Sequence, residues 1–328
     1  MLKLKIWYFY RNTGIMGIKK KQSELHPCNK HNKGYDFKEL CEAFPPLKAF
    51  VFVNAYGTET IDFANQKAVK KLNTALLFKY YKLKFWKFPA DNLCPPIPGR
   101  VDYIHYLADL LKESGISENA NVLDIGTGAN CIYPLLGNAE YGWKFIGTDI
   151  DAKSLEVAKL IIKENELEQS ITLLKQAHST QVLKGILTDT DKFSAAMCNP
   201  PFYGSQEEAM MANTRKLTGL GNENDSNLRN FGGKQQELWY NGGEKAFLHT
   251  YLYESSMFKT QCFWYSSLVS KKENVSGMCD SLKKLKAMDI KIIPMHQGNK
   301  ITRIVAWTFL TEQEQEDWNI QENKIEIS

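Results

Sequence analysis

The residues best suited to chemistry are Asn199, Pro200, Pro201 and Phe202, which follow an apolar stretch ending at Cys198. Two consecutive prolines lack backbone N–H groups and push the residue before them into an extended conformation. The Asn199 side-chain oxygen and the Pro200 carbonyl are then left as acceptors, and Phe202 offers a ring on which an extruded base can stack. Acceptors that hold both N–H groups of an exocyclic amine aim its lone pair at a methyl donor by positioning. The motif thus predicts methylation of a base amine; the alternative is a Pro-Pro turn with a core phenylalanine.

A glycine turn forms a second site, because Gly126 and Gly128 directly follow the apolar stretch 122–125. Glycines let the backbone approach a nucleotide closely. A dinucleotide-binding fold would place a third glycine at position 131, where this sequence has Cys131. The turn therefore favours a nucleoside without phosphates over NAD, although such glycines also serve ordinary strand-to-helix turns.

Asp149 ends the next apolar stretch, about 20 residues after the glycine turn, which is the spacing of a ribose-binding acid. Its carboxylate can accept both hydroxyl protons of a ribose. The alternative role for Asp149 is a helix N-cap. Since Asp151 lies immediately before the following helix, we assign the cap to Asp151 and the ribose to Asp149.

The elements that must position these residues alternate between strands and helices. Helices are expected at 103–111 and 152–164, and strands at 121–125, 144–148, 171–174, 195–198, 262–268, 290–294 and 303–309. The pattern predicts a Rossmann-like α/β fold: a seven-stranded, mostly parallel sheet that ends in an antiparallel hairpin and binds ligands at the carboxyl ends of its strands.

The region before this sheet reads as short helices over 37–93, broken at Pro45-Pro46, Gly57 and Pro89. The stretch from Cys94 to Gly99 contains three prolines, so we expect neither helix nor central strand there and place a domain boundary. This predicts an N-terminal, mainly helical module.

Charge is unevenly distributed, although the net charge is only +4. No acidic residue lies between Asp62 and Asp91, which makes a locally positive field that would suit nucleic acid. The alternative is a solvated helix face, because apolar residues recur there at helical spacing. The lysines of this segment are Lys67, Lys70, Lys71, Lys79, Lys82, Lys84 and Lys87.

Composition, 43% hydrophobic and 24% charged over 328 residues, is typical of a globular protein with room for one α/β domain and a smaller module. No stretch approaches membrane-spanning length and no secretory leader is evident, so we expect a cytoplasmic protein with no membrane partner. The seven cysteines form no C-x-x-C pair. His26, Cys28 and His31 cluster, but tetrahedral zinc needs a fourth ligand, and we expect no metal.

The combination of glycine turn, acid and Asn-Pro-Pro-Phe resembles the class I S-adenosylmethionine-dependent amino-methyltransferases. Further motifs resemble the ribosomal RNA large subunit methyltransferase F family, which methylates N6 of an adenine in 23S rRNA, and the resemblance extends from His26 to Phe309. The eukaryotic adenine methyltransferase of spliceosomal small nuclear RNA is similar at the catalytic core. The motifs that carry the resemblance are Leu93–Tyr103, Phe231-Gly-Gly, Glu237-Leu-Trp, Gly242-Gly-Glu244 and Leu268–Asn274.

The resemblance implies S-adenosylmethionine as cofactor, with Arg100 gripping its methionine carboxylate through a bidentate fork. A residue after the third strand would contact the donor adenine, with Thr180 the best match and Gln176 the second choice. Ser194 and Gln176 stand where related enzymes often have acids, so the sequence departs from the family pattern there. The implied cofactor-binding residues are Arg100, Asp124, Gly126, Gly128, Asn130, Asp149, Gln176 and Thr180.

We divide the chain into a basic, disordered leader (1–25), an RNA-contacting helical module (26–98), a methyltransferase domain (99–312) and a polar tail (313–328). A polar loop at 219–233 is placed where a substrate would bind. The expected partner is 23S rRNA or a large-subunit assembly intermediate, held by phosphate contacts that carry no sequence information. The residues expected to make these contacts are Lys30, Lys33, Lys67, Lys70, Lys71, Lys79, Arg215 and Lys216.

Two other readings stay open. The same motif serves methyltransferases of other amino groups, such as guanine N2, an adenine of the small nuclear RNA type or a protein glutamine. A catalytically silent RNA-binding scaffold with the same fold is the alternative from another class. The basic module argues against a protein substrate, and the presence of Arg100, Asp149 and Asn199 argues against a silent scaffold.

Overall fold

The computed structural model describes residues 25–90, 92–116, 119–208, 211, 238–297 and 300–318, together with the backbone of residues 6–8. The helices are α1 (Phe37–Ala43), η1 (Pro45–Phe50, a 3-10 helix), α2 (Gln66–Tyr81), α3 (Ile97–Glu113), α4 (Ile132–Tyr141), α5 (Ala152–Glu164), α7 (Gly243–Ser255) and α8 (Lys272–Lys284). The strands are β1 (Ile6–Tyr8), β2 (Val51–Val53), β3 (Glu59–Ile61), β4 (Asn121–Ile125), β5 (Lys144–Asp149), β6 (Ile171–Lys175), β7 (Phe193–Cys198), β8 (Cys262–Val269), β9 (Asp289–Gln297) and β10 (Lys300–Thr308).

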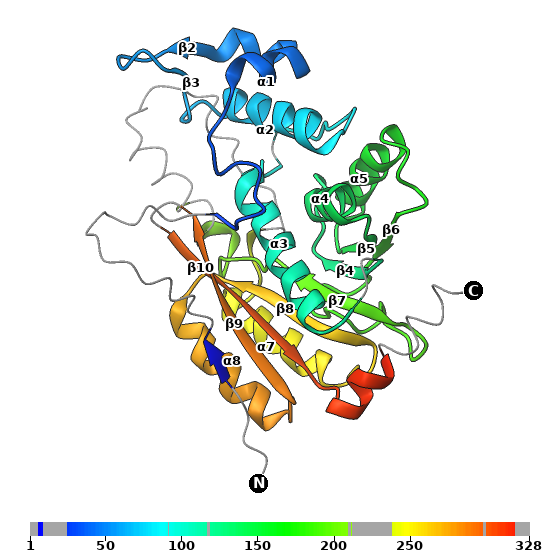
Figure 1. Ribbon diagram of the computed structural model, residues 1–328. Coiled ribbons are helices and arrows are strands. Elements are labelled where there is room, and N and C mark those ends of the chain that lie inside the picture. The colour runs from blue at the N-terminus through cyan, green and yellow to red at the C-terminus, as the bar shows by residue number, and fades with distance from the viewer. Residues whose placement is uncertain are drawn as a thin grey trace.

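The main sheet has the order β6-β5-β4-β7-β8-β10-β9 (Figure 1). The pairs among β6, β5, β4, β7 and β8 are parallel, whereas β10 runs antiparallel to both β8 and β9. This confirms the predicted seven-stranded sheet with its terminal hairpin. One short strand, β1, adds an eighth position at the edge, parallel to β9, from the segment expected to be a leader.

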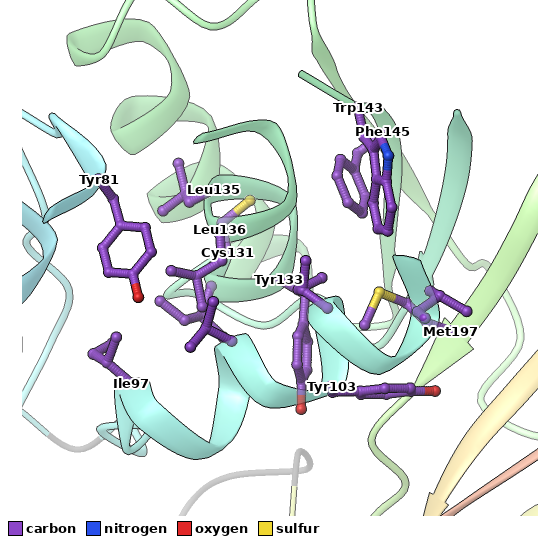
Figure 2. Packing of buried hydrophobic residues seen from close by; sticks show 14 of the residues in the cluster. Tyr81, Ile97, Tyr103, Cys131, Tyr133, Leu135, Leu136, Trp143, Phe145 and Met197 are labelled. Carbon is purple, nitrogen blue, oxygen red and sulfur yellow. The ribbon is translucent and has the colours of Figure 1, made fainter. Parts of the chain in front are cut away.

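The central strands are apolar without alternation, because both faces of the sheet are covered. Every residue of β7 and β8 is buried. Side chains of α3, α4 and α5 pack on one face, and those of α7 and α8 pack on the other. Figure 2 shows Tyr103 of α3 and Tyr133 of α4 meeting Met197 of β7 in the first of these layers.

Helix α3 begins at Ile97, inside the stretch that we expected to be neither helix nor strand. The expectation was wrong at this end because Pro98 lies in the first turn, where no intrahelical partner for its missing N–H is required. The early start places Arg100 in the first turns of α3, and its backbone N–H donates to the Pro96 carbonyl at 3.2 Å.

The N-terminal module consists of α1, η1, the hairpin β2–β3 and α2, and it shares one continuous core with the α3 and α4 layer. Trp86 is 1% exposed and its indole N–H donates to the Asn130 carbonyl at 2.9 Å. Lys30 forms an ion pair with Glu140 of α4 at 2.7 Å. The module is therefore packed against the domain that carries the predicted site.

At the other end of the chain, residues 312–318 are helical, although we assigned positions from 313 onward to a polar tail. Trp318 is 8% exposed and its ring lies edge-on to Phe263 of β8 at 5.7 Å. Among the residues that the structure describes, no helix has the length and apolar character needed to cross a membrane.

Candidate active site

A cavity of about 150 Å³ opens at the carboxyl ends of β4, β5, β6 and β7. The register aligns these ends, since Ile125 of β4 pairs with Thr148 of β5 and with Cys198 of β7. The motifs singled out in the sequence follow these strands and meet here. Predicted residues that line the cavity are Arg100, Gly126, Gly128, Asn130, Asp149, Gln176, Asn199, Pro200, Pro201 and Phe202.

The glycine turn after β4 is held by the end of β5. Gly126 and Gly128 both have positive φ angles, +77° and +63°, which suit glycine. The Asp149 carboxylate accepts the Gly128 N–H through Oδ2 and the Asp151 N–H through Oδ1, each at 2.9 Å. Burial raises the pKa of Asp149, and these backbone donors oppose that rise. Two accepted bonds leave carboxylate lone pairs free to accept from a ligand.

Asp151 is the N-cap of α5, as predicted. Its carboxylate accepts from the backbone N–H groups of Lys153 at 3.2 Å and Ser154 at 3.1 Å. The cap assignment is thereby confirmed, and Asp149 has no capping role.

Two charged residues of the predicted donor site lie in regular elements, Arg100 in the first turns of α3 and Asp124 in β4. Arg100 donates through Nη1 to the Tyr133 hydroxyl at 2.8 Å, and its buried Nε has no hydrogen-bond partner among the described residues. Asp124 is completely buried and does not itself line the cavity. Burial raises the pKa of Asp124 to about 7, an effect that the Arg100 charge partly offsets.

Asn130 and Gln176 line the cavity, but their side chains already have structural roles. Asn130 Nδ2 donates to the Leu93 carbonyl at 3.3 Å, while its Oδ1 accepts the Ile132 N–H at 3.1 Å. Gln176 Nε2 donates to the Lys184 carbonyl, and its Oε1 accepts the His178 N–H, both at 2.9 Å. Each amide thus fixes the loop in which it lies.

Thr180, the best match to the adenine-contacting position, is exposed and lies outside the cavity. Its neighbours Ser179 and Gln181 line the cavity instead, together with Val182. Ser179 and Thr180 together form a turn, and of the two only Ser179 lines the cavity. This geometry does not favour Thr180 as the contact.

Asn199 begins the loop after β7 and lines the cavity. Its Oδ1 is buried and accepts no hydrogen bond within the described part of the chain. The strand before it is anchored, because the Cys198 N–H donates to the Tyr103 hydroxyl at 3.4 Å and Ser266 Oγ donates to the Ala196 carbonyl at 2.9 Å. The oxygen is therefore held at the cavity without a hydrogen-bond donor from the described part of the chain.

The residues after the two prolines pair with a second segment of the cavity wall. The N–H groups of Phe202 and Tyr203 both donate to the Leu238 carbonyl, at 3.2 and 3.1 Å, and the Tyr240 N–H donates to the Tyr203 carbonyl at 3.0 Å. Sequence reasoning did not assign this wall, although Trp239 belongs to one of the motifs that carried the resemblance. Unassigned lining residues include Tyr133, Trp239, Tyr240 and Phe247.

Most of the lysines expected to face RNA have partners within the chain. Lys79 pairs with Glu39 at 3.1 Å, Lys70 donates to the Phe88 carbonyl at 2.7 Å, and Lys71 lies 5.3 Å from the centre of the Phe44 ring. Lys30 pairs with Glu140, as described above. Lys33 and Lys67 are exposed. Arg215, Lys216 and the loop 219–233 lie outside the described residues.

The histidines near the start of the module take part in hydrogen bonds with other side chains. His26 Nε2 lies 3.0 Å from Asp109 Oδ2, and His31 Nε2 lies 2.8 Å from the Tyr81 hydroxyl. Burial lowers the pKa of His31 to about 4, so this ring is neutral near pH 7. Across the described ranges, no group of three His, Cys, Asp or Glu side chains could hold a metal ion.

Comparison with known proteins decides the family. A family described as RNA methyltransferase matches residues 19–311. The ribosomal RNA large subunit methyltransferase F of Flavobacterium psychrophilum is 49% identical over 304 residues, 90% of this chain and 97% of the relative. That of Pseudomonas syringae pv. syringae is 47% identical over 299 residues, 89% of this chain and 91% of the relative. The chain belongs to the ribosomal RNA large subunit methyltransferase F family.

Solved structures give the same result for the fold of this RNA methyltransferase. The hMettl16 catalytic domain in complex with MAT2A 3'UTR hairpin 1 is 29% identical with a TM-score of 0.75, covering 88% of this chain and 96% of that chain. The N-terminal domain of human METTL16 in complex with SAH is 27% identical with a TM-score of 0.71, covering 88% and 100%. The resemblance drawn from the motifs and the predicted class I methyltransferase fold are both confirmed.

Proposed function

We propose that this RNA methyltransferase transfers a methyl group from S-adenosylmethionine to the exocyclic N6 of an adenine in 23S rRNA. The names of the relatives support the ribosomal large subunit as the source of the RNA. The METTL16 domain that was solved with SAH, at 27% identity, supports S-adenosylmethionine as the donor.

The observation that carries the proposal is Asn199 Oδ1, a buried acceptor at the cavity that has no hydrogen-bond partner among the residues that the structure describes. A buried polar atom without a hydrogen-bond partner lowers the stability of the folded protein by roughly 1 to 3 kcal/mol. An N–H group of the substrate that donates to this oxygen would explain why it is kept. Because Pro200 and Pro201 contribute no N–H groups, the loop offers acceptors to an amine. Asn199 Oδ1 and the Pro200 carbonyl then hold the two N–H groups of the adenine amine and orient its lone pair.

Phe202 lines the same cavity and its backbone is fixed by the Leu238 carbonyl. Phe202 follows Asn199 by three positions in the same loop. An adenine that is flipped out and stacks on the Phe202 ring can therefore place its amine next to Asn199. Stacking and two acceptors suffice to place the amine, so no strong base is required in the described cavity wall.

The part of the cavity lined by Arg100, the glycine turn, Asp149 and the loop after β6 is called here the donor half, and it fits the methyl donor S-adenosylmethionine. Asp149 retains free lone pairs for the ribose hydroxyls, and Arg100 has a buried Nε without a partner in the described residues. A guanidinium is suited to the methionine carboxylate. When bound, S-adenosylmethionine supplies an electrophilic methyl group on its sulfonium. Gly126 and Gly128 let the backbone lie close to it.

The proposal is tested by methylation of 23S rRNA from cells that lack this protein, with labelled S-adenosylmethionine and nucleoside analysis of the product. Label is expected in N6-methyladenosine, with 16S rRNA and the Asn199→Ala protein as negative controls. Label in N2-methylguanosine, or in protein, would assign the enzyme to another amino group. No transfer, with intact RNA binding, would favour a silent scaffold.

Donor binding is tested separately by calorimetry without RNA. S-adenosylmethionine is expected to bind and NAD is not, and Asp149→Ala and Arg100→Ala are expected to weaken the binding. Comparison of naked 23S rRNA with isolated large subunits and assembly intermediates then identifies the substrate.

A further inference from the structure

Glu254, in the last turn of α7, is a buried carboxylate for which the described residues supply no basic partner. It is 3% exposed, and the ion pairs of the described residues do not include it. Burial of an unpaired charge is costly unless hydrogen bonds stabilise it. The hydrogen bonds that Glu254 accepts therefore indicate its structural role.

The contacts are three consecutive backbone donors. Glu254 Oε2 accepts the N–H groups of Val182 at 3.0 Å, Leu183 at 2.6 Å and Lys184 at 2.9 Å. An apolar side chain at position 254 would leave all three N–H groups without this acceptor. The carboxylate thus fixes the path of the backbone from 182 to 184.

This segment lies in the middle of the loop between β6 and β7, and its first residue lines the donor half of the cavity. Val182 and Gln181 line the cavity. The loop is closed at its base by Gln176, whose Nε2 donates to the Lys184 carbonyl at 2.9 Å. Glu254 belongs to α7 rather than to this loop, and it binds the backbone N–H groups of the same segment.

The beginning of α7 contacts the acceptor half of the cavity, which is the part lined by residues 199–202 and 238–240. A Cβ on Gly243 would lie 3.4 Å from the Gly204 backbone nitrogen, just after Phe202, and Phe247 of α7 lines the cavity. The first turns of α7 therefore contact the catalytic loop. The last turn of the same helix, through Glu254, holds residues 182–184 of the donor half.

We propose that Glu254 is a positioning residue for the methyl donor: it sets the wall that contacts the donor adenosine while α7 keeps that wall in register with the Asn199 loop. This inference rests on the proposed function, because it assumes that the donor occupies this half of the cavity. Glu254 itself does not line the cavity and has no part in the chemistry.

The test compares Glu254→Ala and Glu254→Gln with the wild-type protein. The Ala variant removes the acceptor, whereas the Gln variant keeps one acceptor oxygen without the charge. Calorimetry with S-adenosylmethionine and with S-adenosylhomocysteine is expected to show donor affinity weakened on the order of 10-fold for Ala, with a smaller loss for Gln. In steady-state assays the KM for the donor rises while the KM for RNA stays unchanged.

Glu244→Gln is the matched control, because Glu244 is a buried carboxylate in the first turn of the same helix. It is 2% exposed and accepts from Ser270 Oγ and from Asn274 Nδ2, both at 2.6 Å, away from the donor wall. We expect it to lower the melting temperature as the Glu254 variants do, but to leave donor affinity unchanged.

If the Glu244→Gln control lost donor affinity in the same proportion to its loss in melting temperature as the Glu254 variants do, Glu254 would have a structural role only. That result would overturn the inference. Unchanged donor affinity in the folded Glu254 variants would overturn it as well. Failure of the wild-type protein to bind the donor is a different result, because it contradicts the proposed function itself.

Discussion

The two halves of the cavity differ in how far their polar groups are satisfied within the chain. On the donor side, Asp149 already accepts two backbone N–H groups and Gln176 uses both ends of its amide. On the acceptor side, the buried Oδ1 of Asn199 accepts none in the described residues. The donor half is thus largely preformed, with Arg100 Nε as a buried group that has no partner in the described residues, whereas the Asn199 oxygen is left for a group that we propose the substrate brings.

This difference assigns separate consequences to the two halves. Changes in the donor half are expected to alter donor binding and folding, because its side chains also hold the backbone. Changes at Asn199 alter turnover, because its oxygen holds little else.

Asn199→Ala is expected to have the largest effect. It removes the acceptor but keeps both prolines and Phe202, so the rate of methyl transfer should fall on the order of 10² to 10³ or further, while donor affinity stays nearly unchanged. Asn199→Asp keeps an acceptor and should retain measurable activity. Single-turnover methylation of a 23S rRNA fragment, with donor calorimetry in parallel, measures both. A rate near wild type for the Ala variant would contradict the proposed role.

Asp124 supplies the pH-dependent prediction for the donor half. Burial raises its pKa from the usual 3.8 to about 7, so the folded state binds this proton more tightly than the unfolded state. Stability from Asp124 is therefore lost as the pH rises from about 4 to about 7 and is constant above that. Asp124→Asn removes the charge, so the variant should gain stability relative to wild type over this range, by up to about 4 kcal/mol.

Urea unfolding of the two proteins at several pH values between 4 and 8, without ligand, measures this difference. Taking the difference cancels other groups, such as His31, whose lowered pKa acts in both proteins. A constant difference across the range would mean that Asp124 is not the titrating group.

The sequence predicted local features better than contacts between distant segments. Asp151 was identified as the cap of α5 because a capping side chain acts within its own turn. The start of α3 was misplaced because prolines were judged as helix breakers, although Pro98 occupies the first turn, where proline is favoured.

Within the site, strand ends were predictable and loops were not. Asn199 and Asp149 follow parallel strands, whose carboxyl ends must converge. Thr180 lies in an irregular turn, where no periodicity indicates which side chain faces inward. The partners of Lys70 and Lys79 come from other segments of the module, so their use within the fold could not be read from a run of basic residues.

Phe202→Ala tests capture of the base in the acceptor half and should have a smaller effect than Asn199→Ala. Stacking contributes roughly 1 to 3 kcal/mol per base, so kcat/KM for RNA should fall by about 5- to 150-fold. Phe202→Tyr keeps an aromatic face and serves as the matched control. Equal losses in donor affinity and in RNA use would show that the ring supports the whole cavity rather than the acceptor half.

The smallest effect is expected outside the cavity, for the phosphate contacts that we propose on the N-terminal module. The phosphate contacts are proposed for exposed lysines such as Lys33 and Lys67, whereas Lys79 is paired with Glu39, so the three lysines are not equivalent. The double variant Lys33→Glu and Lys67→Glu should weaken RNA binding and reduce the slope of log affinity against log salt by roughly 0.7 to 0.9 for each lost contact. Lys79→Gln, the control, should leave the slope nearly unchanged because its charge is already engaged, and neither variant should alter donor affinity. A salt titration of RNA binding measures the slopes. Identical slopes in wild type and the double variant would assign Lys33 and Lys67 to solvation alone and confine RNA recognition to the cavity and its loops.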